Sequence, residues 1–240
     1  MPRRARLKLA GATLHLIQRG NNRSVCFHAV DDYLYYLDQL TDACRAEGIA
    51  LHAYVLMTNH VHLLLTSPSA EGPSNMMKRL GQRYVQYINR SYRRSGTLWE
   101  GRFRSCLVGE EDYLLGCYRY IEMNPVRAGM IEHPADYRWS SYRSNAQGQT
   151  EERLTPHPLY LALGRGPATR QAAYRELFRY ELEPGLVDQI RTATNGGFVL
   201  GSTRYADEVT RMLTRRTQRG QAGRPRQSEA GRGQLGLVLE

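Results

Sequence analysis

Two apolar, β-prone runs separated by two polar residues are the feature that most constrains this chain. Leu51–Met57 and His60–Leu65 flank Thr58-Asn59, a pattern that predicts a β-hairpin. Because side chains alternate between the two faces of a strand, His60 and His62 are expected to point to the same side. Two imidazoles on one rigid strand make half of a divalent-metal site. The competing interpretation is a polar pair at the edge of a sheet.

The segments around this hairpin predict a mixed α+β fold. A first strand is expected over 13–19, a helix from Asp31 to Gly48, a second helix over 75–94 and a last strand over 101–108. With the hairpin, the order is strand, helix, strand, strand, helix, strand. This is the split ferredoxin-like plan, in which both helices pack on one face of an antiparallel sheet. The acids at 110–112 suit the first turn of a third helix.

The chain divides into three parts on composition. Residues 1–145 hold the ferredoxin-like pattern. Residues 146–216 read as a small helical accessory region, with short helices over 157–163, 169–180, 185–194 and 203–216 and little chemistry among them. Residues 217–240 form a basic tail rich in Gly, Arg and Gln, which we expect to be flexible.

The balance of charge favours a nucleic-acid partner. Of 240 residues, 33 are Lys or Arg against 23 Asp or Glu, a formal net charge of +10. Lysine occurs only at Lys8 and Lys78, so arginine supplies 31 of the 33 cations. Arginine binds phosphate and guanine in a bidentate manner. A genome that favours arginine codons would give the same bias.

Cysteine usage and hydropathy bear on the compartment. The four cysteines show no Cys-x-x-Cys pairing, so neither a zinc knuckle nor a disulfide framework is expected. The first eleven residues are basic but lack the apolar core of a signal peptide, and no later run is long enough to span a membrane. We therefore expect a cytoplasmic, nucleoid-associated protein without a membrane partner.

The third predicted helix carries a tyrosine and an amide on one face. Tyr120 and Asn124 are spaced i, i+4, and Pro125 is expected to end the helix directly behind Asn124. Tyr118 is offset by two positions and should face elsewhere. A phenol and a carboxamide on a helix face are, without other context, ordinary surface or core residues.

These residues combine into a chemical hypothesis. A metal held by His60 and His62 would polarise a phosphodiester and stabilise the leaving oxygen. Asn124 would supply its amide oxygen as a third ligand or hold a ligand water. Tyr120 would then attack phosphorus, which gives a covalent phosphotyrosine and a free 3′ hydroxyl.

The same residues resemble a known family. His60-Val61-His62 is similar to the HUH motif of rolling-circle replication initiators, relaxases and single-tyrosine transposases. The wider pattern resembles one branch, the REP-associated tyrosine transposases, in the segments His15–Arg23, Tyr54–Leu64, Leu98–Phe103, Tyr120–Gly129 and Trp139–Tyr142. The resemblance implies the HUH endonuclease fold, a Mg²⁺ or Mn²⁺ ion bound by His60, His62 and Asn124, Tyr120 as nucleophile, and single-stranded DNA at hairpin-forming repeats as partner. It leaves a monomer and a homodimer equally open.

Several polar residues are candidates for DNA contact. The window 76–105 has eight cations against one acid, and Tyr84, Tyr87 and Tyr92 between the arginines would stack bases. An amphipathic helix with a solvated basic side is the alternative. Gly223–Arg226 in the tail resembles a minor-groove hook, although a solvated tail is equally compatible. The predicted DNA-binding residues are Arg19, Asn22, Arg23, Arg83, Arg90, Arg93, Arg94, Arg102, Arg104, Arg224 and Arg226.

Two further histidines could lie near the site. His15 on the first strand is as compatible with a structural partner as with a place in the site, and His52 is the weaker candidate. Two other functions also stay open: a DNA- or RNA-binding protein of the same fold that no longer cleaves, and a metal-dependent phosphodiesterase that uses activated water.

Overall fold

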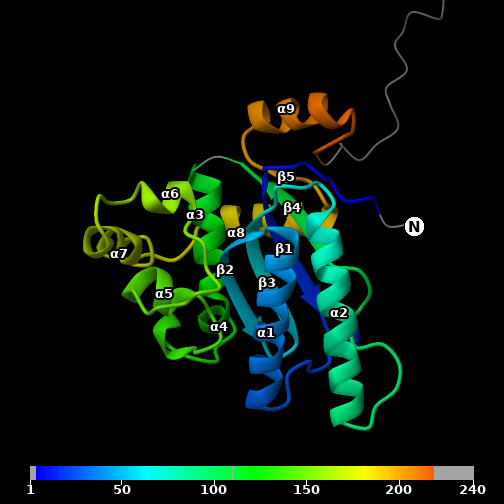
Figure 1. Ribbon diagram of the computed structural model, residues 1–240. Helices are drawn as coiled ribbons and strands as arrows, with labels where there is room; N and C mark the ends of the chain where they lie inside the picture. The colour runs from blue at the N-terminus through cyan, green and yellow to red at the C-terminus, as the bar shows by residue number, and fades with distance from the viewer. Residues whose placement is uncertain (1–3, 110, 219–240) are drawn as a thin grey trace, which may run out of the picture.

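The computed structural model describes residues 4–109 and 111–218. Its first six main elements follow the predicted order and lie where expected (Figure 1). They are β1 (Thr13–Arg19), α1 (Val30–Glu47), β2 (Ala50–Met57), β3 (His60–Thr66), α2 (Gly72–Ser91) and β4 (Arg104–Val108). The strand order is β2-β3-β1-β4-β5, and the first four strands pair antiparallel, as in the ferredoxin-like fold.

Two of these elements differ in length from the prediction. Helix α2 begins at Gly72, three residues early, because Pro73 suits the first turn of a helix, where its missing N–H is not needed. Strand β4 begins at Arg104, three residues late. Gly101 has φ +124°, far from the extended backbone of a strand.

Helices α1 and α2 cover one face of the sheet, as predicted. The apolar side of α2, with Met76, Met77, Leu80, Tyr84 and Ile88, is buried. The proposed role of the α2 tyrosines in base stacking is wrong for Tyr84, which is fully buried and donates its hydroxyl hydrogen to the Cys26 carbonyl. Tyr87 and Tyr92 donate their hydroxyl hydrogens to the Asp32 carboxylate, at the start of α1.

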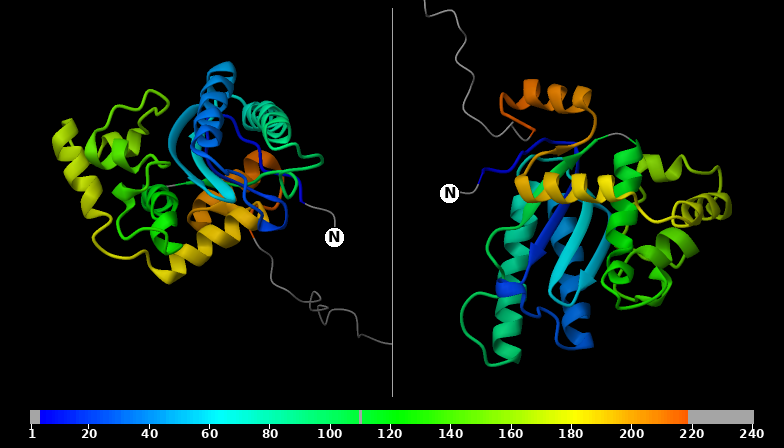
Figure 2. Two further views of the ribbon diagram at one scale, coloured as in Figure 1. Left: turned by 90° about the horizontal axis from the view of Figure 1, so that it is seen from below. Right: turned by 180° about the vertical axis from the view of Figure 1, so that it is seen from behind.

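The opposite face of the sheet is covered by two helices from later in the chain. Helix α3 (Glu111–Glu122) packs against β2 and β3, and α8 (Pro184–Gly196) crosses β4 and β1 (Figure 2). The chain then adds β5 (Val199–Leu200), which pairs in parallel with β4. The residues after 146 therefore contribute a strand to the central sheet and a helix to its face.

Five further helices follow α3 in the described part of the chain. They are α4 (Asn124–Arg127), α5 (Tyr142–Gln147), α6 (Pro158–Leu161), α7 (Pro167–Glu176) and α9 (Thr203–Leu213), with two 3-10 turns, η1 (Asn21–Arg23) and η2 (Pro134–Asp136). The four helices predicted after residue 156 are confirmed: α6 and α9 are shorter than predicted, α7 is shifted towards the N-terminus, and α8 is longer at both ends. Residues 219–240 of the predicted basic tail lie outside the described residues.

A buried carboxylate at the end of α3 joins this helix to α5 and α7. Glu122, at the end of α3, is fully buried. It accepts hydrogen bonds from Ser141 Oγ (2.6 Å), Asn145 Nδ2 (2.8 Å) and Tyr174 Oη (2.7 Å). Burial raises its pKa to about 7, although the three donors act to lower it. One side chain therefore ties α5 and α7 to α3.

Candidate active site

The two histidines of β3 point to the same face of the sheet, as predicted from strand alternation. Across β1 and β3, His62 lies opposite Ile17 and His60 opposite Arg19. The two imidazole rings are 5.1 Å apart between centroids, at an interplanar angle of 81°. This face is the one that α3 and α8 cover, so the pair lies between the sheet and these two helices, with His62 buried and His60 half-buried.

A hydrogen bond engages the Nδ1 atom of each histidine. His60 Nδ1 lies 2.6 Å from Asn59 Oδ1, and the Asn59 amide donates to the Arg23 carbonyl (3.0 Å). His62 Nδ1 lies 2.8 Å from His15 Nε2. His15 thus lies in the site, in direct contact with His62. Nε2 is the nitrogen of His60 and of His62 that these bonds leave to bind a ligand.

All three imidazoles are held neutral. Burial, followed by the charge of Arg19, lowers the pKa of His60 to about 4, and a hydrogen bond with the Asn124 side chain acts in the opposite direction. Burial lowers the pKa of His15 to about 3, and that of His62 falls well below its ordinary value for the same reason. Neutral imidazole is the form that binds a metal ion.

Tyr120 and Asn124 reach the same place from α3 and α4. The Tyr120 ring stands edge-on to His62 and His15, at centroid distances of 5.6 and 5.8 Å. The Asn124 amide nitrogen donates to the Tyr120 carbonyl (3.4 Å). By contrast, Tyr118 is buried against Tyr160 and Tyr174, on another side of the helix as predicted.

The predicted end of this helix is wrong. Helix α3 stops at Glu122, and Asn124 is the first residue of α4, with Pro125 in the first turn. Proline fits there because the first turn of a helix needs no N–H donor. The Met123 amide still donates to the Arg119 carbonyl, so the backbone nearly continues the helix and keeps Tyr120 and Asn124 on one side.

Arg127 is a site residue that the sequence reasoning missed. Its guanidinium carbon lies 4.2 Å from the centroid of the Tyr120 ring, and Nη2 donates to the Tyr120 carbonyl (2.7 Å). Burial lowers the pKa of Arg127 to about 10, while Tyr120 acts to raise it. The one available signal was its place seven residues after Tyr120, within a segment that carries the family resemblance.

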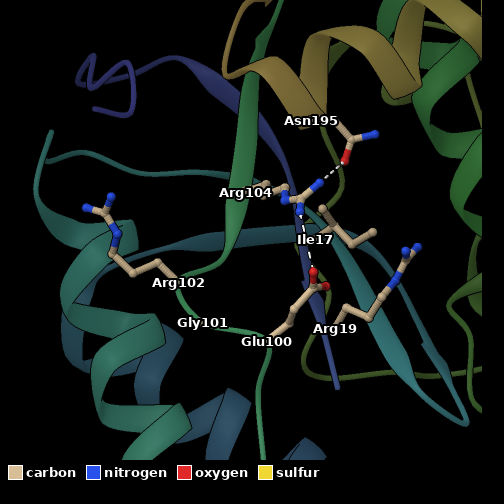
Figure 3. Close-up of a pocket in the computed structure, with 7 residues that line it drawn as sticks. All are labelled: Ile17, Arg19, Glu100, Gly101, Arg102, Arg104 and Asn195. Carbon is tan, nitrogen blue, oxygen red and sulfur yellow. Dashed lines mark hydrogen bonds and ion pairs between the residues drawn. The ribbon is translucent and has the colours of Figure 1, made fainter. Parts of the chain in front are cut away.

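A basic pocket adjoins the histidine pair on the same face (Figure 3). Arg104 anchors it: Nη1 donates to Asn195 Oδ1 (2.7 Å), and Nη2 lies 3.8 Å from Glu100. Because Ile17 and Arg19 lie directly across from His62 and His60, the pocket borders the histidine pair. It is lined by Ile17, Arg19, Glu100, Gly101, Arg102, Arg104 and Asn195.

A second basic hollow, of about 270 Å³, continues from this pocket. Arg4, Arg6 and Arg102 contribute to its lining, with Phe103 and the end of α8. The Arg6 guanidinium lies 3.9 Å from the centroid of the Phe103 ring. Burial and the charge of Arg102 lower the pKa of Arg6. Among the described residues that line it, none is acidic.

The predicted DNA-binding arginines of α2 lie away from the histidines, whereas the Arg23 carbonyl accepts from Asn59, the partner of His60. Arg83 on α2 is bound to Gln39 (2.8 Å) and lies 3.8 Å from Asp42, and α2 covers the opposite face of the sheet. Arg90, Arg93 and Arg94 lie at or beyond the end of that helix. Asn22 and Arg23 form the η1 turn, with φ of 50° and 57°. Arg224 and Arg226 lie outside the described residues.

His52 belongs to another part of the sheet. Its imidazole contacts the Thr155 carbonyl and Thr66 Oγ1.

Among the described residues, no group of three or more His, Cys, Asp or Glu side chains is arranged to hold a metal ion, so the candidate set is two imidazoles and an amide. In the same part of the chain, no helix has the length and apolarity needed to cross a membrane.

Part of this chain is similar in sequence to a known protein. A Haemophilus influenzae (strain ATCC 51907 / DSM 11121 / KW20 / Rd) protein named as a REP-associated tyrosine transposase is 26% identical over 110 residues, which cover 40% of this chain and 61% of that protein. The chain therefore matches less than two thirds of that relative's length.

A solved structure shows the same fold. The structure of a REP-associated tyrosine transposase bound to a REP hairpin matches with a TM-score of 0.55 at 18% identity, over 65% of this chain and 93% of that one. The predicted resemblance and the ferredoxin-like α+β fold are thus confirmed. The sequence profile of the family described as IS200-like transposase matches residues 8–124, so this part of the chain is similar to that family.

Proposed function

We propose that this chain is a metal-dependent endonuclease and strand transferase that cuts and rejoins single-stranded DNA through a 5′-phosphotyrosine. The observation that carries the proposal is the convergence of His60, His62, Asn124 and Tyr120 in one interior site beside an arginine-lined pocket.

The residues fit a divalent cation such as Mg²⁺ or Mn²⁺. His60 and His62 are neutral and have their Nδ1 atoms engaged, so both would bind through Nε2. The Asn124 amide nitrogen donates to the Tyr120 carbonyl, and the Asn124 side chain hydrogen-bonds His60, so its amide oxygen would serve as the third ligand. When bound, the cation would supply Lewis-acid polarisation of the phosphodiester and stabilise the leaving oxygen.

Tyr120 is the proposed nucleophile. Its Oη forms a bond to phosphorus while the bond from phosphorus to O3′ breaks, so the 5′ end becomes linked to the tyrosine. The phenolic proton passes to solvent, and the released O3′ takes one up as a free 3′ hydroxyl. Attack by a 3′ hydroxyl on the phosphotyrosine reverses the step and rejoins a strand.

Arginines beside the site would hold the DNA. Arg19, Arg102 and Arg104 would neutralise phosphates next to the scissile bond. Arg4 and Arg6 would extend that path along the second hollow. The relative solved with a REP hairpin suggests hairpin-forming single-stranded DNA as the substrate class. One chain supplies the whole set of site residues, so a monomer would suffice for cleavage.

The test is incubation of the protein with end-labelled single-stranded hairpin DNA and Mg²⁺ or Mn²⁺, followed by denaturing electrophoresis. Wild type and Tyr118→Phe, the matched control on the same helix, should form a denaturation-resistant protein–DNA band. Tyr120→Phe should lose the band but keep DNA binding. His60→Ala and His62→Ala should lose cleavage and metal affinity together.

Two outcomes would overturn the proposal. Cleavage without a covalent band would identify a nuclease that uses water. Binding of many hairpins without cleavage would identify a DNA-binding protein of this fold.

A further inference from the structure

A chain of hydrogen bonds runs from helix α8 to the edge of the proposed metal site. Thr194 Oγ1 lies 2.7 Å from the Ile190 carbonyl oxygen and 2.9 Å from His15 Nδ1. His15 Nε2 lies 2.8 Å from His62 Nδ1. Thr194 and His15 are 3% and 1% exposed, so water does not compete for these bonds.

The Ile190 carbonyl, at one end of this series of hydrogen bonds, sets the direction of every bond in it. A carbonyl oxygen only accepts, so the Thr194 hydroxyl donates its single hydrogen to Ile190. Thr194 Oγ1 must then accept from His15 Nδ1–H. A neutral imidazole carries one hydrogen, so His15 Nε2 is an acceptor and His62 Nδ1–H donates to it. The lone pair of His62 is left on Nε2.

A second series of hydrogen bonds, through Asn59, gives His60 the same Nδ1–H tautomer. The Asn59 amide nitrogen donates to the Arg23 carbonyl, which fixes Oδ1 as the atom that faces His60. Asn59 Oδ1 accepts only, so His60 Nδ1–H donates to it and the lone pair of His60 also lies on Nε2.

We propose that Thr194 and His15 are positioning residues, which lock His62 in the Nδ1–H tautomer and hold its Nε2 ready for the divalent cation. The inference rests on the metal site proposed above. It assigns His15 a role behind the ligand His62 and excludes it as a ligand, because its Nε2 already accepts from His62. Such partners of ligating histidines orient the ring and commonly change metal affinity by about 10- to 100-fold.

This assignment also gives the C-terminal region a part in the site. Thr194 lies outside residues 8–124, the segment that matches the transposase family. Helix α8 places it against His15, with Cys106 Sγ 3.3 Å from the same hydroxyl. The tautomer of His62 on β3 therefore depends on α8, a helix more than 120 residues later in the sequence.

The experiment compares Thr194→Val, Thr194→Ser and wild type. Valine has the shape of threonine but cannot accept a hydrogen bond, whereas serine can. Thr41→Val is the matched control, because Thr41 also donates to a carbonyl one helical turn back (2.9 Å) but lies on α1, across the sheet. Two readouts are used: ¹⁵N NMR of the histidine rings in the metal-free protein, and the affinity for Mn²⁺.

In wild type, Thr194→Ser and Thr41→Val, the His62 ring should show the Nδ1–H tautomer. Thr194→Val should lose that single tautomer and bind Mn²⁺ about 10- to 100-fold more weakly. An Nε2–H tautomer of His62 in wild type would overturn the proposal without any variant. Unchanged His62 signals and Mn²⁺ affinity in a folded Thr194→Val protein would also overturn it.

The NMR readout separates this proposal from the proposed function. The tautomer is measured without metal or DNA. If wild type shows the Nδ1–H form but neither binds Mn²⁺ nor cleaves DNA, the endonuclease proposal fails while the hydrogen-bond chain stands.

Discussion

Arg127 covers the ring of Tyr120 and holds its backbone. The guanidinium carbon lies 4.2 Å from the ring centroid, and Nη2 donates to the carbonyl of the same residue (2.7 Å). The cation stands over the face of the phenol ring, and the second bond fixes where that ring stands.

Arg127→Met should therefore slow the formation of the covalent DNA adduct by about 2- to 5-fold, since Arg127 is exposed and a cation–π contact at an exposed site is worth about 0.5–1 kcal/mol. The measurement is the single-turnover rate at saturating DNA. Arg119→Met is the control, because Arg119 lies next to Tyr120 on α3 but donates to the Tyr180 carbonyl. Equal rates for the two variants would show that Arg127 has a packing role alone.

The basic pocket should determine how strongly DNA binding depends on salt. Arg102→Gln with Arg104→Gln should make the slope of log K against log salt shallower by about 1.4, the value for two phosphate contacts to a single strand. Arg83→Gln, on the opposite face and already bound to Gln39, should leave the slope unchanged. Fluorescence titration of a labelled hairpin over a range of salt concentrations measures both. A larger effect of Arg83 would move the DNA path to α2.

The Glu122 carboxylate should be essential for stability. Glu122→Ala leaves the buried donors of Ser141, Asn145 and Tyr174 without their acceptor. We expect the free energy of unfolding to fall by about 3 kcal/mol or more, since each unsatisfied buried group costs about 1–3 kcal/mol. Urea denaturation measures the change. The control Glu176→Ala removes a surface ion pair of α7 and should change stability by less than about 1 kcal/mol.

A second line of hydrogen bonds, remote from the site, links the sheet to the segment before α6. His157 Nε2 lies 3.2 Å from Thr13 Oγ1, which is 2.8 Å from Thr66 Oγ1. Thr66 Oγ1 lies 2.9 Å from His52 Nε2, and His52 Nδ1 lies 2.7 Å from the Thr155 carbonyl. Burial lowers the pKa of His52 to about 4, so this histidine is neutral in the folded protein.

Acid should therefore weaken the fold through His52. Between pH of about 6.5 and about 4 the unfolded chain binds a proton at His52 that the folded chain does not, so stability falls as pH falls. His52→Gln should make this dependence shallower by at most about 1.4 kcal/mol per pH unit. Urea unfolding at several pH values, with the exposed His28→Gln as control, measures it. Parallel curves for wild type and His52→Gln would contradict the assignment.

Local pattern in the sequence was enough to predict the frame of the site. Two apolar runs on either side of Thr58-Asn59 predicted the hairpin. The two-residue period of a strand put His60 and His62 on one face, because that period is a property of the backbone. Helical spacing likewise brought Tyr120 and Asn124 to one side, although Pro125 lies in the first turn of α4 and was expected to end α3.

Only the tertiary structure decided what surrounds that frame. It places Thr194 against His15, 179 residues apart, and folds Arg127 back over Tyr120. It also sets the arginines of α2 on the face of the sheet opposite the histidines. No periodicity encodes such contacts, because they depend on how whole helices pack on the sheet. The sequence by itself therefore determined which groups could do the chemistry, and packing decided which neighbours fix their charge and orientation.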